Sequence, residues 1–376
     1  MDVERAAGAA PARVRSPAMK IGIVGMPNAG KSSLFNALTK AGAEAANYPF
    51  TTIEPNIAIV PVEDERLDAL VELLGASEKV ADTIAFHDIA GLVAGAHKGE
   101  GLGNQFLSNI RETDAIMHVV RCHGDDNVIH SEGSVDPARD IETIETELIY
   151  SDLEQAEKRL ERVIRAARGG DKAAVAEKAW LEELIEGYNA GKPARFTPMP
   201  DEVDKGQTVQ PLTAKPVLFV ANVDEGSDEI PEVVRTHAES IGAEVVAISS
   251  RIEAELSELD DEEAAMMRAD LGVAESGLQR VVKGAFSLLN LITFFTVGSG
   301  VRGQSWHLKD GLTVWHAAGE IHGDIQKGFV RAEVVSWDQL IEAGGYSQAR
   351  DKGTLRIEGR DYLMNDGDVI TIKHTN

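Results

Sequence analysis

Short apolar runs alternate with amphipathic stretches along most of the chain. From Lys20 onward, each run of a few apolar residues is followed by a segment with helical spacing. Strands separated by helices are typical of a mostly parallel, doubly wound sheet with helices on both faces. The pattern therefore predicts an α/β fold with a first helix over 31–40. The expected buried strands are 21–25, 57–60, 83–88, 115–120, 217–220 and 244–248.

Two regions depart from this rhythm. Between residues 137 and 205 the sequence is charged, and its apolar residues recur at helical steps on both sides of Gly169-Gly170. That pattern predicts two amphipathic helices folded back as an antiparallel hairpin, or coiled coil. From residue 291 onward, strand-like runs with one helix and a turn at 365–368 predict a small α+β module. The strand-like runs are 294–297, 305–308, 329–335 and 369–373.

Composition restricts the kind of protein. The 376 residues include 43% hydrophobic ones, yet no apolar stretch approaches the length of a membrane span, so we expect no membrane association. The single cysteine, Cys122, excludes a disulfide framework and is typical of a reducing, cytoplasmic setting. The net charge of −25 argues against coating nucleic acid through bulk charge, and no DNA partner is expected.

The first 18 residues carry Ala, Pro and Arg without hydrophobic periodicity. They lack the apolar run of a signal peptide. We expect a disordered N-terminal extension ahead of Met19, with an Arg-bearing transit peptide as the alternative.

The segment from Gly25 to Ser32 carries the clearest chemistry. It reads Gly-Met-Pro-Asn-Ala-Gly-Lys-Ser and matches the P-loop pattern G-x-x-x-x-G-K-S/T between a predicted strand and a predicted helix. Glycines allow backbone N–H groups to curl around phosphates, and the helix N-terminus adds its positive dipole end. In such a site Lys31 reaches the β- and γ-phosphates, and the Ser32 hydroxyl binds Mg²⁺.

Two further segments suit the γ-phosphate and the metal. Asp88-Ile89-Ala90-Gly91 ends a later predicted strand as D-x-x-G, so Asp88 is expected to hold Mg²⁺, mainly through water, and the Gly91 N–H to meet the γ-phosphate. Between this element and the P-loop, the segment 47–52 contains two threonine hydroxyls, from which a γ-phosphate-sensing switch can recruit one to the metal.

The base-recognition motif is altered. Guanine specificity in this class uses N-K-x-D after the fifth strand, and the sequence contains no N-K-x-D. Asn222-Val223-Asp224-Glu225 stands at the expected strand end, with Val223 in place of Lys and Glu225 in place of Asp. Loss of a purpose-built hydrogen-bond pair should remove the guanine preference. Asn222 can still meet the adenine edge, so ATP becomes acceptable.

Taken together, these motifs resemble the Obg-like ATPase (YchF) family of the Obg branch of P-loop GTPases. The resemblance covers the chain from Lys20 to its end. It rests on G-M-P-N-A-G-K-S, N-Y-P-F-T-T, D-I-A-G-L-V-A-G-A-H-K-G-E-G-L-G-N-Q-F-L, N-V-D-E, R-G-G-D-K and the tail A-A-G-E-I-H-G-D-I-Q-K-G-F-V-R-A-E-V. Thr51 stands where the family usually has Cys, and Met26 and Ala29 replace bulkier P-loop residues, without removing a phosphate ligand.

The resemblance implies a nucleotide-binding domain over 19–136 and 206–290, an inserted coiled coil over 137–205, and a β-grasp-like (TGS) domain over 291–376. It also implies ATP hydrolysis in preference to GTP hydrolysis, and association with ribosomes. The Mg²⁺ ligands carried over are Ser32 and Thr52. The implied ATP contacts are Asn28, Ala29, Gly30, Lys31, Ser32, Ser33 and the Val223 backbone.

The group that positions the attacking water is less obvious. A Ras-type site uses Gln directly after D-x-x-G, but the residue here is Leu92, which cannot hydrogen-bond. The candidates are His97 and His130, and we favour His130 because a polar loop suits a residue that arrives only in a closed state. Asn28 could instead hold a monovalent cation such as K⁺ against the phosphates.

Charge points to a partner. The segment from Lys158 to Lys172 contains six basic and two acidic residues, a net charge of +4. The region from Leu291 onward is nearly neutral, with a net charge of −2. These two regions are the ones able to approach RNA of the large subunit or whole ribosome, although a solvated helix face would look the same. Three functions stay open: an ATPase switch on the ribosome, a nucleotide-sensing ribosome-binding module with incidental hydrolysis, and an Obg-type GTPase.

Overall fold

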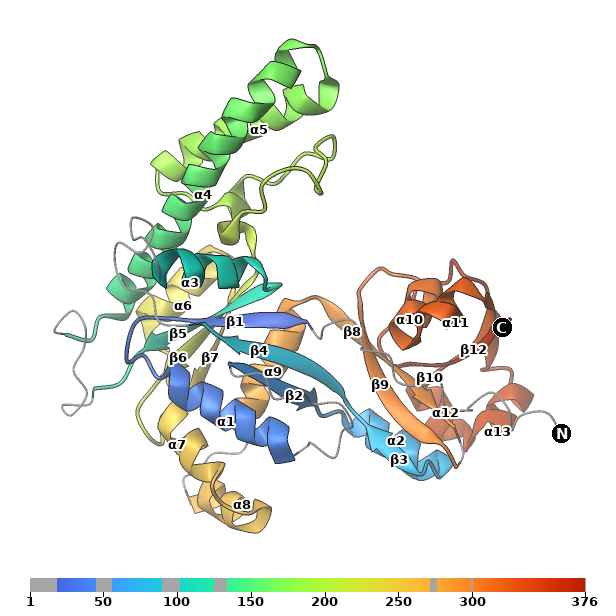
Figure 1. The fold of residues 1–376 in the computed structure, drawn as a ribbon. Helices are drawn as coiled ribbons and strands as arrows, with labels where there is room; N and C mark the ends of the chain where they lie inside the picture. The colour runs from blue at the N-terminus through green and yellow to red at the C-terminus, as the bar shows by residue number, and fades with distance from the viewer. Residues whose placement is uncertain are drawn as a thin grey trace.

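The computed structural model describes residues 19–44, 56–89, 102–124, 134–270, 276–298 and 300–375. Figure 1 shows three parts: a central sheet flanked by helices, a helical hairpin that projects from it, and a second sheet at the C-terminal side. In the part of the chain so described, no helix combines the length and the apolar character needed to cross a bilayer.

The central sheet has six strands in the order β2-β4-β1-β5-β6-β7. Only the β2–β4 pair is antiparallel; the other neighbours run parallel. The strands are β1 (Lys20–Val24), β2 (Ile57–Val62), β4 (Asp82–Asp88), β5 (Ala115–Arg121), β6 (Val217–Asn222) and β7 (Glu244–Ile248). β5 and β6 are buried along their whole length, as expected for central strands covered on both faces.

Helices cover both faces of this sheet, so the predicted α/β class is confirmed. On one face, α1 (Lys31–Glu44) and α9 (Gly277–Leu288) pack side chains such as Leu34 and Val281 into the core. The other face is covered by α3 (Leu102–Arg111), α6 (Glu232–Ser240) and the first half of α4 (Pro137–Arg168). Two shorter helices, α7 (Ser250–Leu256) and α8 (Asp261–Asp270), follow β7.

The predicted helical hairpin is present. α4 begins after the capping residue Asp136, and α5 (Lys172–Asn189) begins after Asp171, whose side chain accepts from the Ala174 N–H. The turn between the helices uses Gly170 at φ +82°, a conformation that glycine adopts without strain. Trp180, Leu181 and Leu184 fill the seam between the helices. The chain returns through the 3₁₀ turns η2 (Ala194–Phe196) and η3 (Leu212–Ala214).

The C-terminal α+β part is built on a second six-stranded sheet, in the order β11-β10-β12-β8-β9-β3. Its strands are β3 (Glu78–Val80), β8 (Leu291–Val297), β9 (Arg302–Lys309), β10 (Phe329–Ser336), β11 (Arg356–Glu358) and β12 (Asp368–His374). One helix was expected here, but four short ones occur among the described residues. The sequence pattern missed the others because each helix is only five to eight residues long, too short for a clear helical periodicity. They are α10 (Val314–Ile321), α11 (Gly323–Lys327), α12 (Trp337–Ala343) and α13 (Tyr346–Asp351).

A segment from early in the chain completes this C-terminal part. α2 (Glu65–Leu74) buries Leu67 and Leu70 in one cluster with Phe295 and Val335, and β3 pairs with β9. The sequence pattern did not reveal this arrangement, because the partners lie more than two hundred residues apart.

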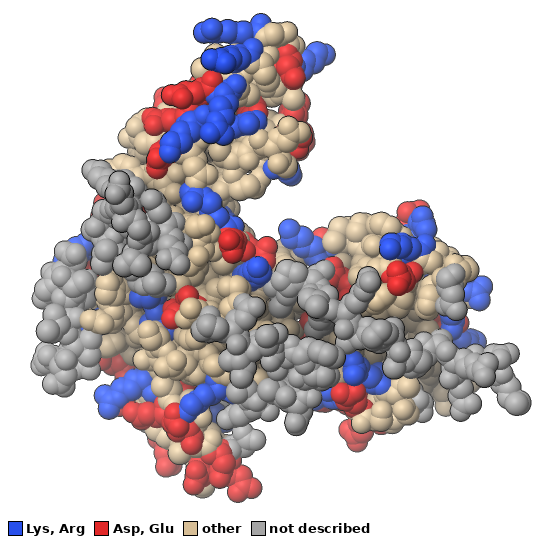
Figure 2. Space-filling model, viewed as in Figure 1, with Lys and Arg blue, Asp and Glu red and all other residues tan. Residues whose placement is uncertain are grey.

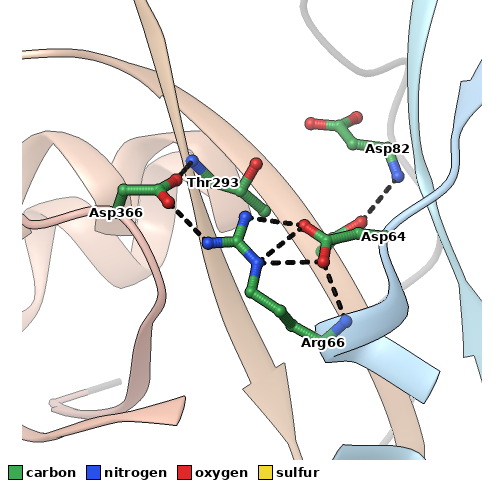
Figure 3. A network of polar contacts seen from close by, with 6 residues as sticks. Asp64, Arg66, Asp82, Thr293 and Asp366 are labelled. Carbon is green, nitrogen blue, oxygen red and sulfur yellow. Dashed lines mark hydrogen bonds and ion pairs between the residues drawn. The ribbon is translucent and has the colours of Figure 1, made fainter. Parts of the chain in front are cut away.

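Polar contacts attach α2 and the start of β4 to the C-terminal sheet at this junction (Figure 3). The Arg66 guanidinium bonds Asp64, which caps α2, and also bonds Asp366, whose other oxygen accepts from the Thr293 N–H at 2.8 Å. At the start of β4, the Asp82 N–H donates to Ser305 Oγ at 2.9 Å. Paired carboxylates around one guanidinium form strong, directional contacts, so α2 is attached to the C-terminal sheet by charge as well as by packing.

Leu70→Ala tests whether α2 belongs to the C-terminal core. Leu70 is fully buried, so its truncation should cost about 2–5 kcal/mol in the free energy of unfolding. Urea unfolding followed by tryptophan fluorescence measures this, since Trp306, Trp315 and Trp337 all lie in the C-terminal part. The matched control is Glu72→Ala on the exposed side of the same helix. Equal stability of the two variants would contradict the shared core.

Candidate nucleotide-binding site

The P-loop joins the end of β1 to the start of α1 at the carboxyl edge of the central sheet. Two of its glycines have positive φ: Gly25 at +155° and Gly30 at +98°. A Cβ on Gly25 would lie 2.4 Å from the Val119 carbonyl oxygen, and one on Gly30 would lie 2.2 Å from the Asn222 amide nitrogen. Both positions therefore require glycine, because a backbone carbonyl approaches one of them and a buried side-chain amide approaches the other.

Lys31 lies at the first position of α1 and is 7% exposed. Its Nζ donates to the Met26 carbonyl at 2.8 Å, inside the curve of the loop. Burial lowers the pKa of Lys31 to about 8, and the nearby Asp88 carboxylate opposes this shift. Burial also raises the pKa of Asp88, with Lys31 opposing. A partly desolvated cation of this kind interacts strongly with an anion that enters the loop.

Asp88 ends β4, which lies beside β1 in the sheet, so the structure brings it to the same edge as the P-loop. A pocket opens beside it, lined by polar side chains that include Asn56, Asn109 and Glu112. A carboxylate and the exposed Ser32 hydroxyl are hard oxygen ligands, the type that Mg²⁺ prefers. The residues present therefore fit the expected metal.

The Asn222 side chain joins three segments at this edge. It is 4% exposed; its amide nitrogen donates to the Ala29 carbonyl at 3.0 Å, and its amide oxygen accepts from the Ser250 N–H at 3.0 Å. The sequence suggested that Asn222 meets the adenine edge. In the structure its amide connects the P-loop to the turn that begins α7.

The neighbouring residues form the side where a base would lie. The Val223 N–H donates to the Ile248 carbonyl at 2.9 Å, so the polar group of this residue that a base could meet is its carbonyl. The Glu225 carboxylate, which replaces the Asp of the guanine motif, lies 3.1 Å from Arg251 Nε. Arg251 comes from the first turn of α7, and Glu255 lies 3.3 Å from the same nitrogen. Sequence reasoning missed Ser250 and Arg251, although the polar run 249–251 directly after a buried strand was a usable signal.

The remaining predicted residues fall into two groups. Asn28 is exposed with φ +60° and Ala29 is buried, both within the P-loop, whereas Ser33 is half-buried in the first turn of α1. Outside the described residues lie Thr52, Gly91, Leu92, His97 and His130.

A mostly parallel sheet with a glycine-bordered loop, a buried lysine at a helix N-terminus and a carboxylate on the adjacent strand defines a P-loop nucleoside-triphosphate-binding protein. Two family models match the chain. One, described as "50S ribosome-binding GTPase", matches residues 20–164; the other, YchF-GTPase_C, described as "Protein of unknown function (DUF933)", matches residues 291–375.

Full-length relatives give the family. The chain is 47% identical to the "Ribosome-binding ATPase YchF" of Bacillus subtilis (strain 168), over 94% of this chain and 98% of the relative. It is 50% identical to the protein of the same name from Haemophilus ducreyi, over 93% and 98%. The solved "Structure of the Schizosaccharomyces pombe YchF GTPase" superposes with a TM-score of 0.84 at 36% identity, covering 94% of this chain and 97% of that one. The chain belongs to the YchF family.

Asn222→Ala tests the connecting role of this side chain. Because the amide supports the P-loop, its loss should weaken ATP and GTP binding by a similar factor, on the order of 30- to 150-fold for two lost buried hydrogen bonds at about 1–1.5 kcal/mol each. Equilibrium titrations with both labelled nucleotides measure this. A selective loss of ATP binding would instead place the Asn222 amide on the adenine edge.

Proposed function

We propose that this protein is a Mg²⁺-dependent ATPase that prefers ATP over GTP and acts as a nucleotide-controlled switch on the ribosome. The observation that carries the proposal is the arrangement at the base side of the P-loop, where the groups that would recognise guanine are altered or already bonded. The names of the relatives, which describe ribosome-binding ATPases, support the same activity.

The argument for adenine rests on donors and acceptors. Guanine presents an acceptor oxygen and N–H donors, whereas adenine presents an amino donor. The Val223 and Ser250 N–H groups are both bonded within the protein, so neither offers a donor for the guanine oxygen. The Glu225 carboxylate, which replaces the Asp that guanine would need, is one methylene longer and forms an exposed ion pair with Arg251. The Val223 carbonyl suits the adenine amino group.

ATP should therefore bind at least as tightly as GTP. Val223→Lys combined with Glu225→Asp restores the guanine motif and should shift the preference toward GTP. Parallel titrations of wild type and double variant with labelled ATP and GTP measure both ratios. A GTP preference of about tenfold or more in the wild type, equal to about 1.4 kcal/mol, would identify an Obg-type GTPase instead.

Hydrolysis requires mainly positioning and charge neutralisation. In the proposed site, backbone N–H groups of 28–33 and the Lys31 ammonium hold the phosphates, while Ser32, Thr52 and Asp88 hold the metal. When bound, Mg²⁺ neutralises charge that develops on the β- and γ-phosphates. His130 orients the attacking water through its imidazole, and Asn28 offers a place for K⁺ as an activator.

His130→Ala tests that role. Because a positioned group contributes to the transition state alone, single-turnover hydrolysis should fall by about 10-fold or more, with ATP affinity nearly unchanged. His97→Ala, made in parallel, should leave the rate close to wild type. If instead His130→Ala hydrolyses ATP normally, the water is positioned by His97 or by a cation at Asn28.

The proposed ribosome contact is the tip of the hairpin. Figure 2 shows Lys and Arg gathered at the far end of α4 and α5, while Asp and Glu gather at the opposite end of the molecule, over α7 and α8. Of the six basic residues at the tip, Arg159 bonds Glu177 at 2.6 and 2.9 Å, and Lys158 pairs with Glu154. The others are exposed in the structure: Arg162, Arg165, Arg168 and Lys172.

Reversing Arg162, Arg165 and Arg168 to Glu tests the RNA contact. Ribosome affinity should fall and depend less steeply on salt, because fewer counterions are released. Sedimentation with ribosomes at several salt concentrations measures both. A control that reverses Lys178, Lys192 and Arg235, outside the tip, changes net charge equally and should bind as wild type. Equal ribosome affinity and salt dependence of the two variants would show that the tip is only a solvated helix face.

Turnover on ribosomes separates the switch from a sensing module. Strong stimulation of ATP hydrolysis by ribosomes is expected of the proposed switch. Nucleotide-dependent binding without such stimulation would identify a nucleotide-sensing module with incidental hydrolysis.

A further inference from the structure

α4 belongs to two parts of the molecule at once. It is a continuous helix of 32 residues. Its first half packs Ile141, Ile144 and Leu148 against the central sheet and α3. Its second half packs Ala156 and Val163 against α5 in the hairpin. The helix has proline only at its first position and contains no glycine, the residues at which helices commonly kink, so a displacement of one half is passed to the other.

Between the two halves, a buried carboxylate clamps the helix. Asp152 is 3% exposed and accepts three hydrogen bonds from the returning chain. The donors are the Leu212 N–H at 2.8 Å, the Thr213 N–H at 2.9 Å and the Thr213 hydroxyl at 2.7 Å. Since Thr213 lies just before β6, this clamp attaches the middle of α4 to the central sheet.

A second contact holds the same turn of α4. Arg111, the last residue of α3, donates from Nη2 to Ser151 Oγ at 2.7 Å. With its amide oxygen turned toward α3, Gln155 accepts from Arg111 Nε at 2.7 Å. Lys215 Nζ donates to the carbonyls of Arg111 and Thr113, so the end of α3 is itself attached to the segment before β6. The end of α3, the middle of α4 and the chain that leads into β6 are therefore all bonded to one another at this place.

The first half of α4 lies against the nucleotide site. Ile141, Ile144 and Leu148 share one apolar cluster with Met26 of the P-loop and with Ile89, the residue after Asp88. Phe106, Leu107 and Ile110 of α3 belong to the same cluster. Packed cores shift between discrete arrangements rather than deforming smoothly, so a change at Met26 or Ile89 is passed on to α4.

These contacts divide α4 into two arms of unequal length. At a rise of about 1.5 Å per residue, Ile141 lies about 16 Å from Asp152, and Arg168 lies about 24 Å from it in the other direction. A tilt about Asp152 therefore moves the tip about 1.5 times as far as Ile141, in the opposite sense. The exposed arginines of the tip lie on the longer arm.

We propose that α4 is a lever, with its fulcrum at Asp152 and Arg111, that converts the state of the nucleotide site into a displacement of the basic tip. The proposal rests on the proposed nucleotide-controlled switch and supplies its means of regulation. Arg111 and Asp152 are positioning residues: they touch neither the P-loop nor the tip, yet both arms turn about them.

The test measures the position of the tip directly. Spin labels at Val175→Cys on α5 and Val233→Cys on α6, two exposed positions, report the distance between tip and sheet in a Cys122→Ser background. Distances are compared in the full-length protein with Mg²⁺ and either a non-hydrolysable ATP analogue or ADP. In the labelled protein that keeps Arg111, the distance between the two labels should differ between the ATP-analogue and ADP states. In Arg111→Ala the change should shrink or vanish, with ATP affinity retained. Arg139→Ala, which removes an arginine near the start of α4, is the matched control and should keep the full change.

Ribosome affinity provides the second readout. A coupled wild type should show a ratio of ATP-state to ADP-state affinity of about 5-fold or more in either direction, and Arg111→Ala should bring it toward 1. Ser151→Ala and Arg111→Lys serve if Arg111→Ala fails to fold, since each weakens the contact between Arg111 and α4. A tip distance identical in the two nucleotides, or an unaltered change in Arg111→Ala, overturns the lever. A tip that moves without any change in ribosome affinity leaves the lever standing and overturns the proposed switch.

Discussion

The amide of Asn222 holds together the three segments on which the nucleotide site depends. It bonds the P-loop at Ala29 and the start of α7 at Ser250, and it approaches so closely that residue 30 must be glycine. With this amide in place, the curve of the phosphate loop and the wall facing the base are set by the same side chain. The buried Lys31 then faces the space enclosed by the loop, and the ends of β1 and β4 bring Asp88 beside it.

The charge of the molecule is arranged along its length. The chain carries a net charge of −25, but the hairpin tip presents four exposed basic residues, and the acidic residues of α7 and α8 lie at the other end (Figure 2). Such separation orients a protein in the field of a polyanion, because the basic end is attracted and the acidic end repelled. The clamp at Asp152 attaches the hairpin that carries this basic end to the chain that leads into β6.

Features encoded by neighbouring residues could be predicted from the sequence. The strand–loop–helix at Gly25–Ser32 and the hairpin turn at Gly169-Gly170 are of this kind, and the fold class and the family were confirmed. Contacts between distant residues could not be predicted from patterning alone. The attachment of α2 to the C-terminal sheet, the bond between Asn222 and Ser250 and the clamp of Asp152 on Thr213 each depend on how separate elements pack. The roles of Thr52 and His130 stay predictions, since both lie outside the described residues.

A crystal structure with Mg²⁺ and a non-hydrolysable ATP analogue tests the central claim most directly. The account predicts that the adenine amino group lies within hydrogen-bond distance of the Val223 carbonyl, with the Asn222 amide still bonded to Ala29 and Ser250 and Glu225 still paired with Arg251. An Asn222 amide rotated onto the base, or a base held by the Glu225 carboxylate, would contradict it.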